Sequence, residues 1–145
     1  MCGIAGICHT DGPDGISLKT LENMISVVRH RGPDETGVYL DDRVGLAHAR
    51  LSIIDLSSGV QPMHNEDETL WIVFNGEIFN YVELREELEQ KGHRFYTTSD
   101  TEVILHLYEE EGPDCVARMN GQFALAIWDT KRKGLFLTRD RVGIR

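Results

Sequence analysis

The sequence predicts an α+β fold in which antiparallel sheets are covered by helices. Several candidate strands follow one another with few helices between them, which argues against the alternating order of a parallel βαβ fold. The segments "GQFALAIWD" (121–129) and "GLFLTRD" (134–140) flank the charged turn "TKRK" and predict a hairpin. With 145 residues, of which 41% are hydrophobic and 27% charged, the chain fits a single domain with a sizeable core.

The N-terminal part contains one candidate strand and one candidate helix. "GIAGIC" (3–8) has the composition of a buried strand, so we expect the first residues to be interior and Cys8 to be a small buried side chain. Apolar residues recur at helical spacing from 18 to 28. We expect Ser17 to cap this helix and Gly32-Pro33 to follow its end.

The middle of the chain adds strands and a second helix. "GVYLDDRVGLAHARLSIID" (37–55) predicts two strands joined by a short acidic turn, and "TLWIVFNG" (69–76) predicts another strand. "NYVELREELEQKG" (80–92) predicts a helix, with Asn80 and Glu83 at capping-box spacing.

A short strand and a third helix precede the hairpin. "HRFYTT" (93–98) predicts the strand, and "DTEVILHLYEEEG" (100–112) predicts the helix. Ser99 and Glu102 have the spacing of a capping box for this helix.

Charge and cysteine content exclude several classes of protein. The formal net charge is -9 and the basic residues are scattered, so we expect no nucleic-acid partner. The sequence has no basic leader and no apolar run of membrane-spanning length, which favours the cytoplasm. The three cysteines, Cys2, Cys8 and Cys115, have no metal-site or redox spacing. We therefore expect reduced thiols and no metal in this domain.

Cys2 directly follows the initiator methionine, so removal of Met1 would leave a thiol and a free amine on one residue. An α-amine is partly neutral near pH 7 to 8 and can accept a proton. A thiol is a good nucleophile only as the thiolate, and an adjacent base can generate it. Cys2 is thus a candidate nucleophile, although an ordinary second-position cysteine remains the alternative.

Four further polar features are not required by the predicted scaffold. Arg50 sits within the apolar run "LAHARLSII", where a buried cation needs an anion. "FNGEIFN" places Asn75, Gly76 and Glu77 within another apolar run, and Asp100 begins a helix.

Each of these features also has a structural explanation. Asn75-Gly76 is a strong hairpin-turn signal, and Asp100 could simply favour the positive end of a helix dipole. Arg50 could lie on an exposed edge, and Glu77 on a solvated strand face. Together, however, a nucleophile, a cation, two anions and a pair of amide donors match a free amino acid with a side-chain amide, glutamine in particular.

Six stretches of the sequence resemble one known family. The resemblance to the class II glutamine amidotransferase domain, and among its members to the asparagine synthetases, runs in order from Cys2 to Arg145 through "MCGIAGI", "RHRGPDETG", "LAHARLSIIDLSSGVQPM", "FNGEIFNYVELREEL", "SDTEVILHLYEEEG" and "RDRVGIR". It implies the N-terminal-nucleophile fold, a four-layer αββα sandwich of two antiparallel sheets between helices.

The resemblance also implies roles for the polar residues. Cys2 would be the nucleophile after methionine removal, and the Asn75 side chain and Gly76 backbone N–H would form the oxyanion hole. Arg50 would bind the α-carboxylate of glutamine, whereas Glu77 and Asp100 would bind its α-ammonium. We expect the helix N-terminus to keep Asp100 ionised. The predicted activity is hydrolysis of glutamine to glutamate and ammonia through a Cys2 thioester.

The resemblance further implies what lies outside residues 1–145. The family usually continues with more strands and then a synthetase domain that uses ATP and magnesium. We therefore expect residues 1–145 to be a C-terminally incomplete glutaminase domain, without the synthetase domain that is its partner. We also expect that a homodimer can form. The ammonia acceptor stays open. A catalytically silent docking or regulatory module, or an N-terminal-nucleophile hydrolase of another amide, are the alternative functions.

Overall fold

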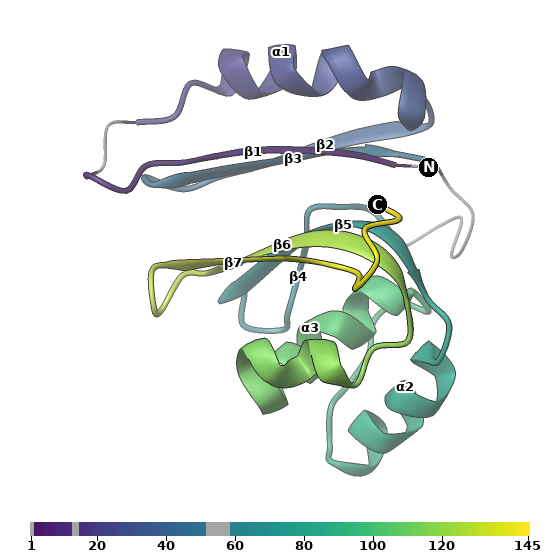
Figure 1. Ribbon diagram of the computed structural model, residues 1–145. Coiled ribbons are helices and arrows are strands. Elements are labelled where there is room, and N and C mark those ends of the chain that lie inside the picture. Colours follow the sequence, from purple (N-terminus) through teal and green to yellow (C-terminus); the bar gives the residue numbers. More distant parts are fainter. Residues whose placement is uncertain (1, 13–14, 52–58) are drawn as a thin grey trace.

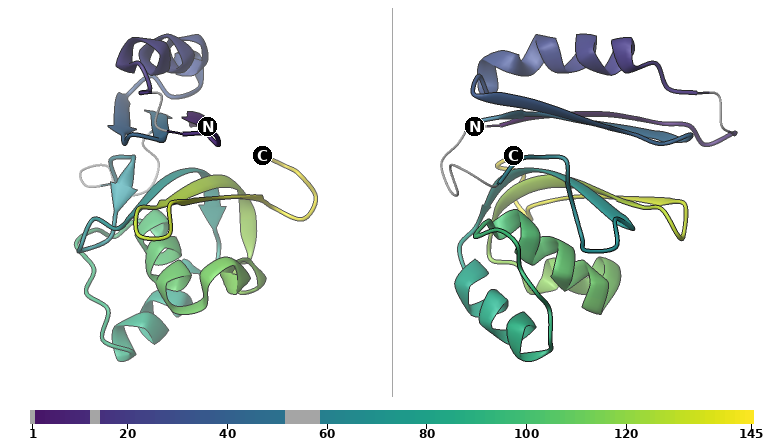
Figure 2. Two further views of the ribbon diagram at one scale, coloured as in Figure 1. Left: turned by 90° about the vertical axis from the view of Figure 1, so that its left-hand side faces the viewer. Right: turned by 180° about the vertical axis from the view of Figure 1, so that it is seen from behind.

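The fold is a stack of four layers, in the order helix, sheet, sheet, helices (Figure 1). The computed structural model describes residues 2–12, 15–51 and 59–145. Figure 2 shows from two further directions that the sheets face one another and that helices cover both outer faces. The predicted α+β class and its sandwich of two antiparallel sheets are confirmed.

The first sheet carries the N-terminal strand at one edge. It contains β1 (Gly3–Cys8), β2 (Glu35–Leu40) and β3 (Val44–Arg50) in the order β1-β3-β2, all antiparallel. Helix α1 (Leu18–Val28), followed by the 3-10 turn η1 (Arg29–Arg31), covers its outer face. The contact is apolar, with Leu21 and Ile25 packing on the alanines of β3.

The second sheet has the order β4-β5-β6-β7. Its strands are β4 (Met63–His64), β5 (Leu70–Ile78), β6 (Gly121–Asp129) and β7 (Gly134–Arg139). β6 and β7 form the hairpin that the sequence predicts. The short strand β4 was not predicted, because two residues are too few to show a period of two.

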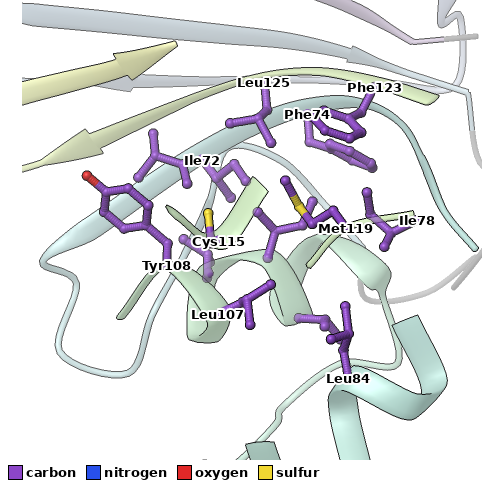
Figure 3. Packing of buried hydrophobic residues seen from close by; sticks show 14 of the residues in the cluster. Ile72, Phe74, Ile78, Leu84, Leu107, Tyr108, Cys115, Met119, Phe123 and Leu125 are labelled. Carbon is purple, nitrogen blue, oxygen red and sulfur yellow. The ribbon is translucent and has the colours of Figure 1, made fainter. Parts of the chain in front are cut away.

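Helices α2 (Tyr81–Gln90) and α3 (Asp100–Glu111) and the 3-10 turn η2 (Gly112–Ala117) cover the outer face of the second sheet. The largest apolar core lies between them and this sheet (Figure 3). Its members shown there include Ile72, Phe74, Ile78, Leu84, Leu107, Tyr108, Cys115, Met119, Phe123 and Leu125. All residues from Asp100 to Tyr108 are buried, so the N-terminal end of α3 is fixed from several sides.

A smaller core holds the two sheets together. Val44 and Leu46 of β3 pack against Val73 of β5 and against Ala126 and Trp128 of β6. The indole Nε1 of Trp128 donates a hydrogen bond of 3.0 Å to Asp41 Oδ2, at the turn between β2 and β3. The sheets are therefore fixed relative to one another, which the site described below requires.

The predicted strand at 93–98 is wrong. The segment is a loop, because the backbone N–H groups of Tyr96 and Thr97 donate to the buried carboxylate of Glu102 at 2.8 and 2.7 Å. Glu102 thus binds this loop instead of completing a capping box. The Ser99 cap itself is confirmed, because its Oγ accepts from Thr101 N at 3.2 Å.

Other local predictions also fail for identifiable reasons. Asn80 does not cap α2, because its amide bridges Arg118 O and Asn120 N at 3.0 and 2.9 Å. Among the described residues, Ser17 accepts its helical hydrogen bonds through its carbonyl and not its hydroxyl. Cys8 is exposed, because within the described residues β1 pairs with β3 alone and leaves its other flank open.

The two strands predicted within 37–55 are β2 and β3, joined at the predicted acidic turn. β3 ends at Arg50, and the part of the prediction from residue 52 to 55 lies outside the described residues. In the part of the chain that the structure describes, no helix is long and apolar enough to cross a membrane.

Candidate active site

One small cavity between the two sheets brings all six predicted site residues together. Its lining includes the six, Cys2, Arg50, Asn75, Gly76, Glu77 and Asp100. They come from the residue before β1, the end of β3, the C-terminal part of β5 and the first turn of α3. The cavity has a volume of about 70 Å³, so it can hold more than one water molecule.

Cys2 lies just before β1 and reaches this cavity. Its Sγ accepts a hydrogen bond from the Leu51 backbone N–H at 3.4 Å and lies 3.7 Å from Leu51 O. The carbonyl of Cys2 accepts from Arg31 Nε at 3.1 Å, which fixes the backbone that carries the thiol.

Asn75 and Gly76 do not form a turn. They lie within β5 and pair with Ala124 and Phe123 of β6, so the hairpin-turn interpretation is wrong. A Cβ on Gly76 would lie 2.2 Å from Gln122 O, closer than atoms can approach. Glycine is therefore required at this position, because β5 and β6 come too close together for any side chain.

Arg50 is a buried cation at the end of the central strand of the first sheet. It is 4% exposed, so the exposed-edge interpretation is wrong. Its Nη1 forms an ion pair of 2.7 Å with Glu35 Oε2. A guanidinium carries five N–H donors in a fork, so it can hold Glu35 and a second carboxylate at the same time.

Asp100 and Glu77 bring negative charge to another part of the cavity. Asp100 is 5% exposed, and its Oδ2 accepts from Ile78 N at 3.0 Å. Burial raises the pKa of Asp100 to about 6, outweighing hydrogen bonds from backbone N–H groups, and the charge of the half-buried Glu77 raises it further. The helix N-terminus was expected to keep this carboxyl group ionised. Burial opposes that effect by raising the pKa, although at about 6 the group is still mostly ionised at pH 7.

Two residues that support the cavity were not identified from the sequence. Gln61, in its lining, accepts from Phe74 N at 2.6 Å and donates to Thr101 Oγ1 at 3.3 Å. Fully buried His48 is 3.1 Å from Phe74 O through Nε2. Because a carbonyl only accepts, this nitrogen carries the proton. Burial lowers the pKa of His48 to about 4, so the ring is neutral.

Together these two side chains hold both backbone polar groups of Phe74, the residue before Asn75. They do so where β5 extends beyond its pairing with β4. The strand that carries Asn75 and Gly76 is thus fixed by side chains from β3 and from the segment before β4. The sequence signals for these two residues are weak. His48 is a lone histidine in an apolar strand, and Gln61 is a glutamine before a proline.

The sandwich of two antiparallel sheets between helices is the fold of the N-terminal-nucleophile amidotransferases. A glutamine phosphoribosylpyrophosphate amidotransferase from Bacillus subtilis, solved with ADP and GMP, matches 70% of this chain and 24% of its own, with a TM-score of 0.56 and 24% identity. A structure described as the allosteric regulatory enzyme of purine biosynthesis matches 98% of this chain and 32% of its own, with a TM-score of 0.61 and 22% identity.

The chain belongs to the glutamine amidotransferase domain family, whose model matches residues 1–145. It is 44% identical, over 100% of its length and 23% of the relative's, to "Asparagine synthetase [glutamine-hydrolyzing] 1" of Bacillus subtilis. Several other curated relatives bear the same description. The chain spans between 19% and 29% of the length of the curated relatives compared.

Proposed function

We propose that this chain hydrolyses glutamine to glutamate and ammonia through a thioester on Cys2, and that the ammonia serves an ATP-dependent, asparagine synthetase-like domain. The observation that carries the proposal is the chemistry of one cavity, which is lined by a thiol, a buried guanidinium, two carboxylates and an Asn-Gly pair. The descriptions of the relatives support the proposed ammonia acceptor.

The charges of the cavity suit a free amino acid. The guanidinium of Arg50 would take the α-carboxylate, and Glu77 and Asp100 would take the α-ammonium. Two carboxylates close enough to raise the pKa of Asp100 repel each other, and a bound cation relieves that repulsion. An acyl or peptide amide lacks these terminal charges, so it would offer no α-carboxylate to Arg50 and no α-ammonium to Glu77 and Asp100.

The reaction would begin once Met1, which lies outside the described residues, has been removed. The neutral α-amine of Cys2 would accept the thiol proton, directly or through a water, as sulfur attacks the carboxamide carbon. The negative charge that develops on the carboxamide oxygen would be stabilised by the Asn75 side-chain amide and the Gly76 backbone N–H. The backbone that carries both donors is fixed in advance, because β5 is held by its neighbours.

The second half of the reaction would reuse the same groups. The protonated amine would give its proton to departing ammonia and leave a thioester between Cys2 and the glutamyl group. A water activated by the amine would then hydrolyse the thioester to glutamate. Each step needs only groups of this chain and water, and ATP and magnesium would act in the synthetase domain. The free thiol requires a reducing compartment, which fits the cytoplasm.

The test is release of glutamate by three forms of the processed protein, namely wild type, Cys2→Ala and the control Cys8→Ala. Cys8 is exposed at the far end of β1 and outside the cavity lining, so its loss should leave the rate unchanged. We expect glutamine to be hydrolysed by wild type and Cys8→Ala and not by Cys2→Ala, with asparagine and a simple acyl amide turned over poorly.

Each alternative function predicts a different result. A silent docking or regulatory module would release no glutamate in any form, although the processed N-terminus and the fold are intact. A hydrolase of another amide would prefer the acyl amide to glutamine. Equal rates for wild type and Cys2→Ala would exclude the thioester mechanism.

A further inference from the structure

A cluster of histidines and carboxylates lies outside the cavity lining, against α3. It contains His93 from the loop after α2, His106 and Glu109 from α3, and Glu66 from the turn after β4. The two imidazoles face each other with their Nδ1 atoms 3.1 Å apart. His106 is fully buried, whereas the side chain of His93 is 16% exposed.

The outer nitrogen of each ring is directed at a carboxylate. His93 Nε2 lies 3.1 Å from Glu110 Oε1, and His106 Nε2 lies 3.7 Å from Glu102 Oε1. A carboxylate can only accept, so the proton of the neutral His93 ring belongs on Nε2 and its Nδ1 presents a lone pair. The two Nδ1 atoms cannot both present a lone pair at 3.1 Å, so either His106 Nδ1 carries a proton that Glu109 accepts, or a cation lies between the two rings.

Two further oxygens approach the same point. Glu109 Oε2 lies 2.7 Å from His106 Nδ1 and 3.6 Å from His93 Nδ1. Glu66 Oε2 lies 3.9 Å from His106 Nδ1. The other oxygen of Glu109 accepts from Asn65 Nδ2 at 2.7 Å, which turns its partner oxygen toward the histidines.

We propose that this cluster is a structural site for a divalent transition metal, preferentially zinc, with His93 Nδ1, His106 Nδ1, Glu109 and Glu66 as ligands. Neighbouring ligand atoms around a tetrahedral zinc ion at about 2.0–2.2 Å lie roughly 3.3–3.6 Å apart. The four distances that involve an Nδ1 atom, 2.7 to 3.9 Å, bracket this range, and the ligand atoms of Glu66, His93 and His106 all lie within 4.8 Å of one another. Imidazole nitrogens select zinc and its neighbours over magnesium or calcium.

The surroundings agree with a metal site rather than a surface ion pair. A carboxylate on the outer nitrogen, as Glu110 provides for His93, orients a metal-bound imidazole and increases its basicity. Glu102 lies 3.7 Å from His106 Nε2, beyond hydrogen-bond distance. Two ligand carboxylates would balance the charge of a divalent cation. The site is partly buried, because the side chain of His106 is fully buried and that of Glu66 is 47% exposed. Four protein ligands leave no open position, so the site is structural and not catalytic.

The site would join three separate segments. His93 lies in the loop between α2 and α3, Glu66 lies in the turn between β4 and β5, and both would be tied to the middle of α3. The same helix presents Asp100 to the cavity from its first turn. The proposal departs from the expectation of no metal in this domain, because that expectation rests on cysteine spacing and the proposed ligands come from three separate segments.

The test uses protein freed of metal by a chelator, in a Cys2→Ala/Cys8→Ala background that removes the accessible thiols. Zinc binding is measured by titration calorimetry and thermal unfolding, and cobalt is used as a spectroscopic probe of geometry. The variants are His93→Gln and Glu66→Gln, both at partly exposed positions, and the control is His30→Gln, an exposed histidine outside the cluster.

We expect one zinc ion per chain, a raised Tm and the absorption of tetrahedral cobalt in the background protein and in His30→Gln. His93→Gln should weaken zinc binding by about 100-fold or more and Glu66→Gln by about 10-fold, with the metal-free fold intact by circular dichroism. The proposal is overturned if zinc binds no more tightly than magnesium, or if His93→Gln and His30→Gln bind it equally. Because no step uses glutamine, the outcome is independent of the glutaminase test.

Discussion

Asn75 and Arg50 line the same cavity but are proposed to act at different stages of the reaction. The contacts of Arg50 with a substrate carboxylate would be equally strong before and during attack, so they would affect binding. The hydrogen bond from the amide of Asn75 would reach its full strength only when negative charge develops on the substrate oxygen. The two side chains should therefore affect different kinetic constants.

Replacement of Asn75 by alanine should lower kcat by about 100- to 1000-fold, because loss of one oxyanion donor typically costs about 2.7–4 kcal/mol of barrier. The KM for glutamine should change little. Steady-state glutaminase kinetics test this, with Arg50→Gln as the comparison, for which KM should rise first. A KM effect without a kcat effect in Asn75→Ala would contradict the proposed oxyanion hole.

The raised pKa of Asp100 predicts pH-dependent binding of glutamine. Burial, with Glu77 nearby, raises its pKa to about 6, so acidification through pH 6 removes a negative charge that the substrate ammonium needs. Affinity should therefore fall as the pH falls from 7 to 5. Calorimetry on Cys2→Ala avoids the titration of the catalytic amine in the reaction rate.

The control for this prediction is Asp100→Asn, which should bind glutamine weakly at every pH with a flatter profile. The raised pKa of Asp100 has the opposite effect on the stability of the free protein. A carboxyl group that holds its proton more tightly when folded makes stability fall as the pH rises from about 4 to 6. Glutamine affinity independent of pH across this window would contradict a role for Asp100 in binding the ammonium.

The strand β5 shows how an element positions the proposed chemistry. Its inner residues pack in the core, while Gly76 allows β6 to approach closely. A Cβ there would meet Gln122 O at 2.2 Å, whereas a Cβ on Gly134 would meet nothing within 4 Å. These two glycines differ in packing, and they make a matched pair for mutation.

Gly76→Ala should lower the free energy of unfolding by about 1–3 kcal/mol, since β5 and β6 must separate to admit the methyl group. It should also displace the proposed oxyanion hole and reduce glutaminase activity. Gly134→Ala should unfold close to wild type. Urea denaturation of the three proteins measures the difference, and equal midpoints for the two variants would contradict the close-packing argument.

The sequence predicts elements best where local pattern and tertiary structure agree. The β6–β7 hairpin and α1 carry their own signals, so they are found nearly to the residue. The loop at 93–98 has a strand-like pattern, but the buried carboxylate of Glu102 takes its N–H groups. Such a partner cannot be read from local composition.

The residues of the site also differ in whether the sequence alone identifies them. A buried arginine in an apolar strand and a cysteine at position 2 are conspicuous without a structure, and both line the cavity. Gln61 and His48 act through the backbone of Phe74, so they are meaningful only once β3, β4 and β5 have been assembled. The cluster around His106 likewise depends on three segments meeting.

At the scale of the whole molecule, the sandwich joins residues that are distant in sequence. The first sheet supplies Cys2 and Arg50, and the second sheet and α3 supply the Asn-Gly pair and the two carboxylates. The core between the sheets, which includes Trp128 and Leu46, sets the distance between these halves. The proposed activity thus depends on packing of the complete sandwich and not on any single motif.

The central claim is that the thiol of an N-terminal Cys2 attacks the amide of glutamine bound in this cavity. The most direct test treats the processed protein with a glutamine analogue that carries an electrophilic diazoketone in place of the amide, followed by mass-spectrometric mapping. We predict a single label on Cys2, blocked by excess glutamine and absent from protein that retains Met1. A label on exposed Cys8, or labelling of Cys2 that glutamine does not slow, would contradict the account.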